Sequence, residues 1–431
     1  MTGTGRLTRR TLLRAGAATV TATAATGCAE PDRAIQVAVV WNAEELDHFR
    51  EVLAGYPRPV QLISAGDDLD AFLRARHLAG TSPDVAILPR PGLVREYARL
   101  GWLAALDAHG PTTPPAGTPP NLHDRLRDDN RQYGVWVKLA HKSLFWHLPE
   151  PAFDPPETWE KLVELTTGLG REAIRSGGPA PLAIGAADGW VLTDWFENVL
   201  ADIASGATYD ALAGDTPNWR GPEVREALDR LAGLWSIPGA FPGGGRRALL
   251  TQFAESVIQV MTTRKALLVF ESDFVEGVAT TFRPDVTPAW IPFPRGPNRT
   301  THPLVVGGDA AVVFKASRYG DELVRWLVEP NSFAPWLDRG GYLSPNLDLA
   351  PDPGRDQLRR KLAAQISAAR DNLRFDLSDQ LPGSFTGSDG VGIWRIMQDF
   401  FSDVTGDRLE GAVGRATDAL AGAARTARIG R

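Results

Sequence analysis

The chain has 431 residues, of which 43% are hydrophobic and 23% charged, and its formal net charge is −6 at pH 7. This composition excludes a disordered or membrane-embedded protein, and the length predicts two lobes or domains rather than a single core. The acidic balance argues against nucleic acid and anionic lipid surfaces as partners.

The first residues of the chain differ in kind from the rest. They contain four arginines and no acidic residue, followed by a mild apolar run that is too short to span a membrane. The Arg9-Arg10 pair resembles a twin-arginine export signal, and the single cysteine, Cys28, ends "AATGC", which resembles a bacterial lipobox. We therefore expect a signal peptide over 1–27, lipidation of Cys28, a linker over 28–33 and an anchor on the outer face of the cytoplasmic membrane. Loss of the four arginines lowers the formal net charge from −6 to −10.

The mature chain begins with an alternation of strands and helices. Short, uncharged stretches rich in β-branched residues predict buried strands, and apolar residues at helical spacing predict the helices between them. This order predicts a parallel sheet with helices on both faces. The strands are expected at 34–41, 59–65 and 82–91, and the helices at 42–56, 67–80 and 92–101.

Ligands of such sheets bind at the carboxyl ends of the strands. In this chain those ends are Trp41 and the turn Pro89-Arg90-Pro91, so Trp41 and Arg90 are candidate ligand-binding residues.

A long polar segment, expected on the surface, separates these elements from the longer elements that follow. Extended segments are expected to cross between the lobes, and Gly307-Gly308 to form a turn where a ligand or another backbone can come close. The polar segment is predicted at 107–131, the crossing at 133–146, helices at 155–169 and 221–235, and strands at 286–294 and 303–317.

The stretch "DGWVLTDWFENVL" (188–200) predicts a helix whose two tryptophans have different roles. Trp195 falls on its broad apolar stripe and belongs to the core. Trp190 and Asp194 lie about one turn apart on the other side, and an aromatic ring beside an acceptor suits a sugar. Packing of Trp190 under a loop is the alternative. In "GVGIWRIMQDFF" (390–401), Trp394 similarly lies outside the apolar stripe and is expected to face a cleft.

Catalytic, metal and cofactor motifs are weak. The seven histidines are scattered and there is one cysteine, so no metal site is expected. Neither a G-x-S-x-G motif nor a phosphate-binding loop occurs, and we expect no cofactor. The enzymatic alternative is a glycoside hydrolase, because it requires two carboxylates across a sugar bond. The candidate carboxylates are those of Asp194, Asp273, Asp309 and Asp379.

Eight stretches in one order give the chain a family resemblance. They resemble the extracellular solute-binding proteins of bacterial ABC sugar transporters, of family 1 type, and in particular the lipoproteins that bind α-glucosides. The stretches are 79–107, 133–149, 155–162, 181–212, 221–228, 305–314, 336–346 and 374–399.

This resemblance implies an α/β, two-lobe periplasmic-binding-protein-like fold of type II. Each lobe would be a mainly parallel sheet flanked by helices, with the ligand in a cleft that closes by a hinge motion. Lobe 1 is expected to consist of 34–140 and 284–330, and lobe 2 of 141–283 and 331–431.

The resemblance also implies a function and a set of site residues. The protein would capture a disaccharide or oligosaccharide, such as an α-glucoside, and deliver it to a membrane permease; we expect a monomer and no enzymatic activity. A binder or sensor of a non-sugar solute is the other alternative. The family more often has a Gln-like residue in the place of Arg90, whose guanidinium would suit an acidic or modified sugar. The residues expected near the cleft are Arg90, Trp190, Asp194, Phe274, Gly308, Asp309, Asp379 and Trp394.

Overall fold

The computed structural model describes most of the mature chain. The predicted signal peptide, Cys28 and the predicted linker up to residue 32 lie outside the described residues. Within them, no helix combines the length and the apolar character that crossing a membrane requires. The described residues are 33–41, 43–66, 69–109, 117–150, 154–297, 299–315, 317, 319–347, 357–369, 372–386 and 392–429.

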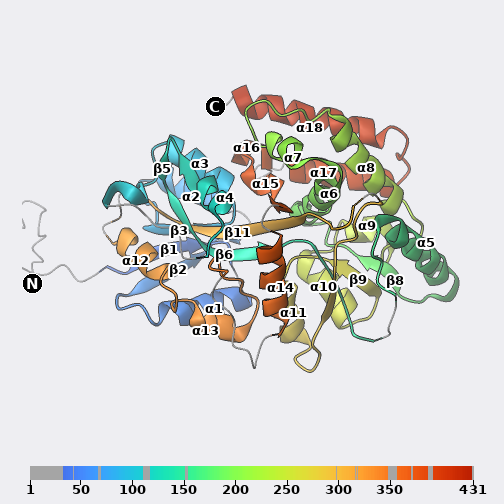
Figure 1. Cartoon of the computed structure of the whole chain (residues 1–431), viewed down its shortest axis with the longest axis horizontal. Coiled ribbons are helices and arrows are strands. Elements are labelled where there is room, and N and C mark those ends of the chain that lie inside the picture. The colour runs from blue at the N-terminus through green and yellow to red at the C-terminus, as the bar shows by residue number, and fades with distance from the viewer. Residues whose placement is uncertain are drawn as a thin grey trace, which may run out of the picture.

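The first lobe begins with the predicted alternation of strands and helices (Figure 1). The strands β1 and β3 contain almost only apolar residues, and both neighbours of β1 in the sheet are parallel to it. The elements are β1 (Ile35–Val39), α1 (Ala43–Leu53), β2 (Val60–Ser64), α2 (Leu69–Leu78), β3 (Val85–Leu88) and α3 (Pro91–Arg99).

The predicted polar surface segment contains short elements where the structure describes it. A tight hairpin joins two of them through Asp129 and Asn130, which both have positive φ angles of 46° and 61°. Asp and Asn tolerate this conformation better than most residues, which explains the hairpin at this point. The elements are α4 (Pro120–His123), β4 (Arg127–Asp128) and β5 (Arg131–Gln132).

Two long strands complete the first sheet and lead toward the second lobe. β6 (Gly134–His141) pairs antiparallel with β11 (Leu304–Val313), which also pairs antiparallel with β3 and parallel with β12 (Leu373–Phe375). The order is β12-β11-β3-β1-β2, with β6 on β11, so the first sheet has three parallel and two antiparallel pairings.

The second lobe is built on a smaller sheet of order β10-β7-β9-β8. Only β8 and β9 are parallel, so the expectation of a mainly parallel sheet is wrong for this lobe. Its elements are β7 (Leu144–His147), α5 (Trp159–Ser176), β8 (Ala180–Ala183), α6 (Gly189–Ile203), α7 (Gly206–Ala211), α8 (Pro222–Trp235), α9 (Gly244–Ala248), α10 (Phe253–Met261), β9 (Ala266–Phe270), α11 (Val275–Phe282) and β10 (Ala289–Pro292).

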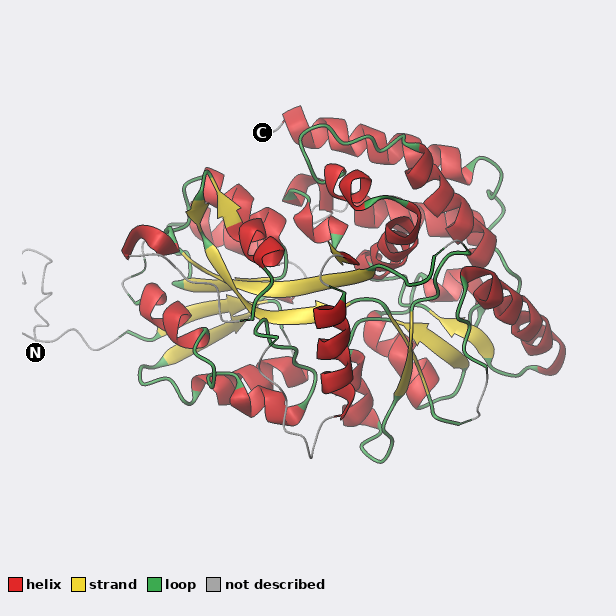
Figure 2. Cartoon of the chain, in the orientation of Figure 1, coloured by secondary structure: helices red, strands yellow, loops and turns green. Residues whose placement is uncertain are grey.

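The C-terminal part of the chain returns to both lobes (Figure 1), and it is mainly helical (Figure 2, in the same orientation). Its helices are α12 (Gly320–Leu327), α13 (Ala334–Arg339), α14 (Gln357–Ala368), α15 (Leu377–Gln380), α16 (Gly383–Thr386), α17 (Ile393–Thr405) and α18 (Ala412–Ile429).

The sheets place three segments differently from the predicted lobe boundaries. β10 was expected in lobe 1, but it pairs with β7 of the second sheet. α13 and β12 were expected in lobe 2, but Trp336 of α13 packs in the core around β1, and β12 pairs with β11. The chain therefore returns to the first lobe only after β10, and leaves it again only after β12, so both of these boundaries lie later in the sequence than predicted.

Apolar side chains of the described residues form three clusters, one mainly in each lobe and a third that includes residues of both lobes, such as Leu88 and Val269. One cluster contains β1 and helices α1, α12 and α13, and another contains α6, α8, α17 and α18. Trp195 lies in the second of these clusters with no solvent exposure, edge-on to Phe270 at 4.9 Å between ring centroids, which confirms its predicted place in the core.

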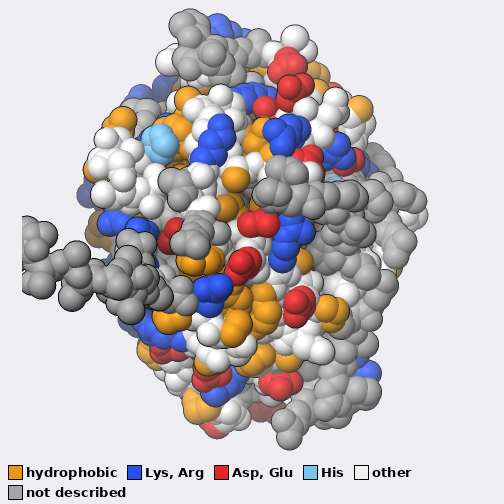
Figure 3. Space-filling model, turned by 90° about the vertical axis from the view of Figure 1, so that its left-hand side faces the viewer, with side chains coloured by type: hydrophobic (Ala, Val, Ile, Leu, Met, Phe, Trp, Pro, Cys, Tyr) orange, Lys and Arg blue, Asp and Glu red, His pale blue; other side chains and the backbone are white. Residues whose placement is uncertain are grey.

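Acidic and basic side chains alternate on the described part of the end of the molecule nearest the N-terminus (Figure 3). Ion pairs among the first-lobe helices include Arg339–Glu51 at 2.7 Å and Arg325–Asp321 at 2.9 Å. The described part of this face therefore carries charges of both signs.

Candidate functional site

A cavity of about 260 Å³ is lined by residues from both lobes. The first lobe contributes the ends of β1 and β3, and the second contributes the start of α6 and the loop after β9. Its lining consists of Val40, Trp41, Glu45, Leu69, Pro89, Arg90, Leu93, Lys138, Ala140, Lys142, Trp190, Phe253, Phe274, Gly308, Asp309, Ser378, Asp379 and Trp394.

Most of the candidate residues named from the sequence lie in this lining. These are Trp41, Arg90, Trp190, Phe274, Gly308, Asp309, Asp379 and Trp394. Asp194 and Asp273 do not lie in it. The carboxyl ends of β1 and β3 meet the cavity because they are neighbouring parallel strands that end at the same edge of the sheet.

Gly307 and Gly308 lie within β11 and do not form the predicted turn. The pairing register of β11 with β6 shifts between Asp309 and Ala310, which is an irregularity typical of a β-bulge. A Cβ atom on Gly308 would lie 2.7 Å from the carbonyl oxygen of Lys138. The expected close approach of another backbone is therefore present, but it occurs inside a strand.

Three aromatic residues of the second lobe form one side of the cavity, which we call the aromatic wall: Trp190, Phe253 and Phe274. The Trp190 ring centroid lies 5.6 Å from that of Phe253 and 6.0 Å from that of Phe274, and the two phenylalanines lie 5.0 Å apart. Trp190 keeps part of its surface exposed to the cavity. Outside the apolar stripe of α6, Trp190 thus packs on Phe253 and Phe274 and also lines the cavity.

Two further tryptophans line the cavity from other elements. Trp41 is 3% exposed, and its indole N–H donates to the Asp309 carboxylate at 3.2 Å. The guanidinium of Arg90 lies over the Trp394 ring, 5.5 Å from its centroid. The cation–π contact orients Arg90 across the cavity toward the start of α17.

The remaining polar lining forms a charged wall, consisting of Glu45, Lys138, Lys142, Asp309 and Asp379. The ammonium of Lys138 pairs with Glu45 at 2.7 Å. Burial lowers the pKa of Lys138, but the nearby carboxylates raise it more, so that Lys138 stays protonated. Burial raises the pKa of Asp309 to about 6, against the opposing effects of Lys138 and the Trp41 N–H.

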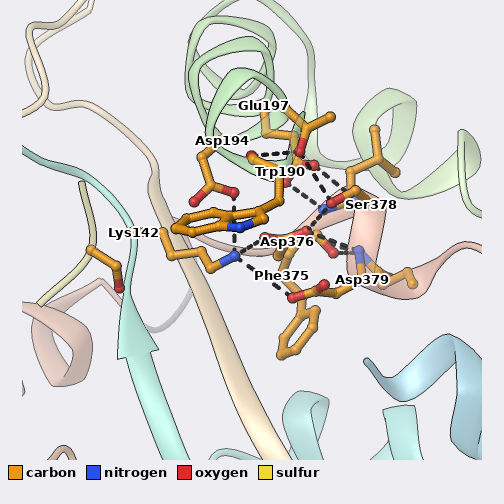
Figure 4. Close-up of polar contacts among 12 residues, drawn as sticks. Lys142, Trp190, Asp194, Glu197, Phe375, Asp376, Ser378 and Asp379 are labelled. Carbon is orange, nitrogen blue, oxygen red and sulfur yellow. Dashed lines mark hydrogen bonds and ion pairs between the residues drawn. The ribbon is translucent and has the colours of Figure 1, made fainter. Parts of the chain in front are cut away.

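Lys142 is the centre of a buried group of carboxylates at the other end of the charged wall (Figure 4). Its ammonium contacts Asp376 and lies 3.2 Å from Asp194 and 3.7 Å from Asp379. Burial raises the pKa of Asp194 to about 8 and the pKa of Asp379 well above its ordinary value. Burial also opposes ionisation of Asp376, but the ammonium and the hydrogen bonds to this carboxylate hold its pKa below the ordinary value.

The structure corrects the expected positions of Asp194 and Asp273. Asp194 was expected to bind the ligand directly, but it lies behind Lys142 and is 2% exposed. The Asp273 carboxylate accepts the backbone N–H of His141 at 2.7 Å and the hydroxyl of Ser272 at 3.1 Å. Both side chains support residues of the crossing between β6 and β7 instead of facing the cavity.

Asp194, Glu197 and Asp376 place oxygen atoms within 4.8 Å of one another, a spacing that could hold a metal ion. The Lys142 ammonium contacts two of these three carboxylates. The Lys142 side chain therefore supplies positive charge at the cluster of Asp194, Glu197 and Asp376, where a metal ion would otherwise supply it.

Several lining residues were missed by the sequence analysis, namely Glu45, Lys138, Lys142, Phe253 and Ser378. The lysines carried a signal. They interrupt "YGVWVKLAHKSLFW" (133–146), an otherwise apolar crossing segment, and a charged residue inside a buried strand requires a partner or a function.

Comparisons with known proteins identify the family. A family model described as "Bacterial extracellular solute-binding protein" matches residues 60–331. The osmoprotective compounds-binding protein GgtB of Synechocystis sp. is 28% identical over 90% of this chain and 93% of its own length. The alpha-glucosides-binding periplasmic protein AglE of Rhizobium meliloti is 25% identical over 88% of this chain and 86% of its own length.

Solved structures share the fold at lower sequence identity. A protein studied for xylan utilization in Caldanaerobius polysaccharolyticus has a TM-score of 0.73 at 16% identity, covering 90% of this chain and 100% of its own. The solute receptor AcbH, described as preferring β-D-galactopyranose, has a TM-score of 0.72 at 15% identity, covering 90% and 98%. These matches confirm the predicted two-lobe fold.

The family model covers more than half of the chain, and its members bind solutes rather than transform them. It confirms the predicted family, an exported protein and a binding role in place of the hydrolase alternative. The chain belongs to the bacterial extracellular solute-binding proteins.

Proposed function

We propose that this protein is the substrate-binding component of an ABC transporter and that it binds a saccharide in the cavity between its lobes. The observation that supports this proposal most strongly is the presence of both an aromatic wall and a charged wall in the lining of one small cavity. The C–H face of a sugar ring stacks on aromatic rings, while its hydroxyl groups donate to carboxylates and accept from ammonium groups.

The cavity size favours a small ligand. Its volume of about 260 Å³ lies just below the range of roughly 300–1,000 Å³ for pockets that hold drug-sized molecules. In this conformation we therefore propose one or two sugar rings as the ligand, with Trp190 as the stacking platform and Asp309 as an acceptor.

The chemistry of the polar lining favours an uncharged ligand over an acidic sugar. Lys138 and Lys142 are already paired with carboxylates of the protein, and Arg90 lies over an indole ring. A ligand carboxylate would have to compete with these contacts and would lie close to Asp309 and Asp379. We therefore no longer favour the acidic sugar suggested by Arg90 alone.

A thermal-shift screen against mono-, di- and trisaccharides tests the proposal, with calorimetry on each hit. A ligand at 100 times its dissociation constant stabilises the folded state by about 2.7 kcal/mol, which is readily measured. We expect at least one uncharged saccharide to raise the Tm and to be recovered chemically unchanged. No shift with any saccharide would contradict the proposal.

A second candidate ligand class is a small osmoprotective solute that is not a sugar. The observation that favours it is the similarity to GgtB along nearly the whole chain. Polyols and zwitterionic solutes therefore belong in the same screen, and a shift with these solutes alone would select this second candidate.

We also propose that Cys28 carries the lipid anchor, which would keep the protein next to its membrane permease. The supporting observation is the position of this single cysteine after an arginine pair and a short apolar run. The wild-type protein should fractionate with membranes and carry acyl chains detectable by mass spectrometry, whereas Cys28→Ser should be released. Membrane association of Cys28→Ser equal to that of the wild type would contradict the anchor.

A further inference from the structure

The cavity contains two residues from a segment that contacts both lobes, Asp376 to Gly383, which we call the bridging segment. Ser378 and Asp379 of this segment line the cavity. They lie on α15, a helix of only four residues. A helix this short leaves most of its backbone N–H groups without internal partners and is not stable by itself. The position of Ser378 and Asp379 must therefore be fixed by contacts from outside the helix.

Glu197 of α6 provides the main contact from the second lobe. Its side chain is fully buried, and its two carboxylate oxygens accept the backbone N–H groups of Leu377 at 2.7 Å and of Ser378 at 2.8 Å. Burial and the neighbouring carboxylates of Asp376 and Asp194 raise the pKa of Glu197, whereas Lys142 and the Ser378 N–H lower it. Glu197 itself does not line the cavity.

Asp376 completes the attachment of the segment at the same end. Its Oδ1 atom accepts the backbone N–H of Asp379 and the hydroxyl of Ser378, both at 2.9 Å. Its other oxygen contacts Lys142, which also lies 3.7 Å from the Asp379 carboxylate. The residues that hold the backbone of α15 are thus connected to the charge that faces the ligand.

The far end of the bridging segment is attached to α3 of the first lobe. Glu96 accepts the Gly383 N–H at 3.0 Å, and Arg95 donates to the Gln380 carbonyl at 2.9 Å. The backbones are in close contact, because a Cβ atom on Gly92 would lie 2.2 Å from the Leu381 carbonyl oxygen. The bridging segment is therefore held from the first lobe as well as from the second.

We propose that Glu197 is a positioning residue of the ligand site: it touches no ligand, but it fixes the backbone of α15 so that Ser378 and Asp379 face the cavity. The expected effect of Glu197 on ligand affinity rests on the proposed function. The expected effect of Glu197 on the bridging segment rests only on the contacts of this side chain.

The informative variant is Glu197→Gln, because it keeps the size of the side chain and replaces one acceptor oxygen by an NH₂ group that faces a backbone N–H. Loss of one hydrogen bond to a buried carboxyl group corresponds to a loss of affinity on the order of tenfold. The matched control is Asp202→Asn on the same helix. Asp202 is also buried and accepts a backbone N–H, that of Gly296 at 2.9 Å, but it does not line the cavity.

Two measurements on the mature protein test the proposal. The first is amide hydrogen exchange without ligand, in which Glu197→Gln should lose protection in peptides covering 376–386 and keep it in the β-sheets, while Asp202→Asn should keep protection in 376–386. The second is the dissociation constant of a saccharide found in the screen. It should rise for Glu197→Gln, stay unchanged for Asp202→Asn, and show no further rise when Glu197→Gln is added to a Ser378→Ala/Asp379→Asn background.

The outcomes separate this inference from the proposed function. Unchanged exchange in 376–386 for Glu197→Gln would overturn it, whether or not any saccharide binds. Lost protection without a change in affinity, or a further loss of affinity in the double-variant background, would overturn the role in ligand binding. Absence of saccharide binding by the wild type would overturn the proposed function, while the exchange result would still decide whether Glu197 holds the segment.

Discussion

The aromatic wall and the charged wall of the cavity are built in different ways. The aromatic wall consists of rings that pack on one another, with centroids 5.0–6.0 Å apart, and each ring contributes its own apolar face. The charged wall consists of titratable groups whose charges depend on each other, since Lys142 is near three buried carboxyl groups. A change in the first wall should act mainly on ligand affinity, whereas a change in the second should also act on folding stability.

The two lysines of the charged wall extend this comparison. Both come from the same crossing segment, but Lys138 pairs with Glu45, whose side chain is 37% exposed, whereas Lys142 pairs with Asp194 and Asp376, whose side chains are 3% and 0% exposed. An exposed partner can turn toward water when its lysine is lost, but a buried partner cannot. The same substitution should therefore have unequal effects at the two positions.

The largest effect is expected for Lys142→Met. It leaves buried carboxylates without their cation, and breaking a buried pair in this way costs about 3–5 kcal/mol of folding stability. Chemical denaturation at several pH values would measure it. The uncompensated carboxylates take up protons in the folded state, so the loss should be greatest at high pH and become smaller as the pH falls. Lys142→Arg is the control that keeps the charge, and a loss below about 1 kcal/mol for Lys142→Met would show that the cluster is not interdependent.

The next largest effect is expected for Trp190→Ala, and it should appear in binding. Loss of a stacking platform should weaken saccharide binding by about 1–3 kcal/mol, measured by calorimetry. Trp195→Phe is the control on the same helix, because Trp195 is fully buried in the core and should affect the Tm without affecting affinity. Equal affinity of Trp190→Ala and the wild type would return Trp190 to a packing role.

A smaller effect is expected for Lys138→Met. Since Glu45 can turn to solvent, we expect a stability loss of about 1 kcal/mol, much less than for Lys142→Met. Lys138 lowers the pKa of Asp309, so the midpoint of any pH dependence that comes from Asp309 should move to higher pH in this variant. Stability losses of the same size at the two lysines would contradict the distinction between them.

The smallest effect is expected from pH alone. The pKa of Asp309 is raised to about 6, so this carboxylate takes up a proton as the pH falls through 6. A neutral acid is a weaker acceptor, and affinity should fall by about fivefold between pH 7 and pH 5. A carboxyl group with a raised pKa binds more protons folded than unfolded, so its contribution to folding stability decreases as the pH rises from 3.8 to about 6. Asp309→Asn should remove the pH dependence of binding, and its persistence in that variant would assign it to another group.

Local patterns predicted the elements of the first lobe well. Periodicity, which depends on nearby residues, predicted the uncharged strands around β1 and the helices between them. It also predicted the core position of Trp195 in the second lobe. The second sheet was less predictable, because the partner of β10 is β7, about 140 residues earlier in the chain, and no local pattern encodes that pairing.

The candidate site was predicted only in part, because local patterns identify some of its residues but not the contacts between distant segments. Trp190 and Trp394 were found because they lie outside the apolar stripes of their helices, and Trp41 and Arg90 because they follow strand ends. Asp194 was misplaced because a helical pattern predicts which face of the helix a side chain lies on, but not which residues of other segments cover that face. In the structure Lys142, from a different element, lies in front of Asp194.

The sequence by itself determined the family, the strand and helix order of the first lobe, and which aromatic residues were not needed for a core. Only the tertiary structure decided which carboxylates face the cavity, which ones neutralise Lys142, and that Glu197 holds the segment carrying Asp379. The physical reason is the range of the interactions. Backbone periodicity and burial act over a few residues of sequence, whereas charge pairing and hydrogen bonds in a cavity act between groups that come together only when both lobes are folded.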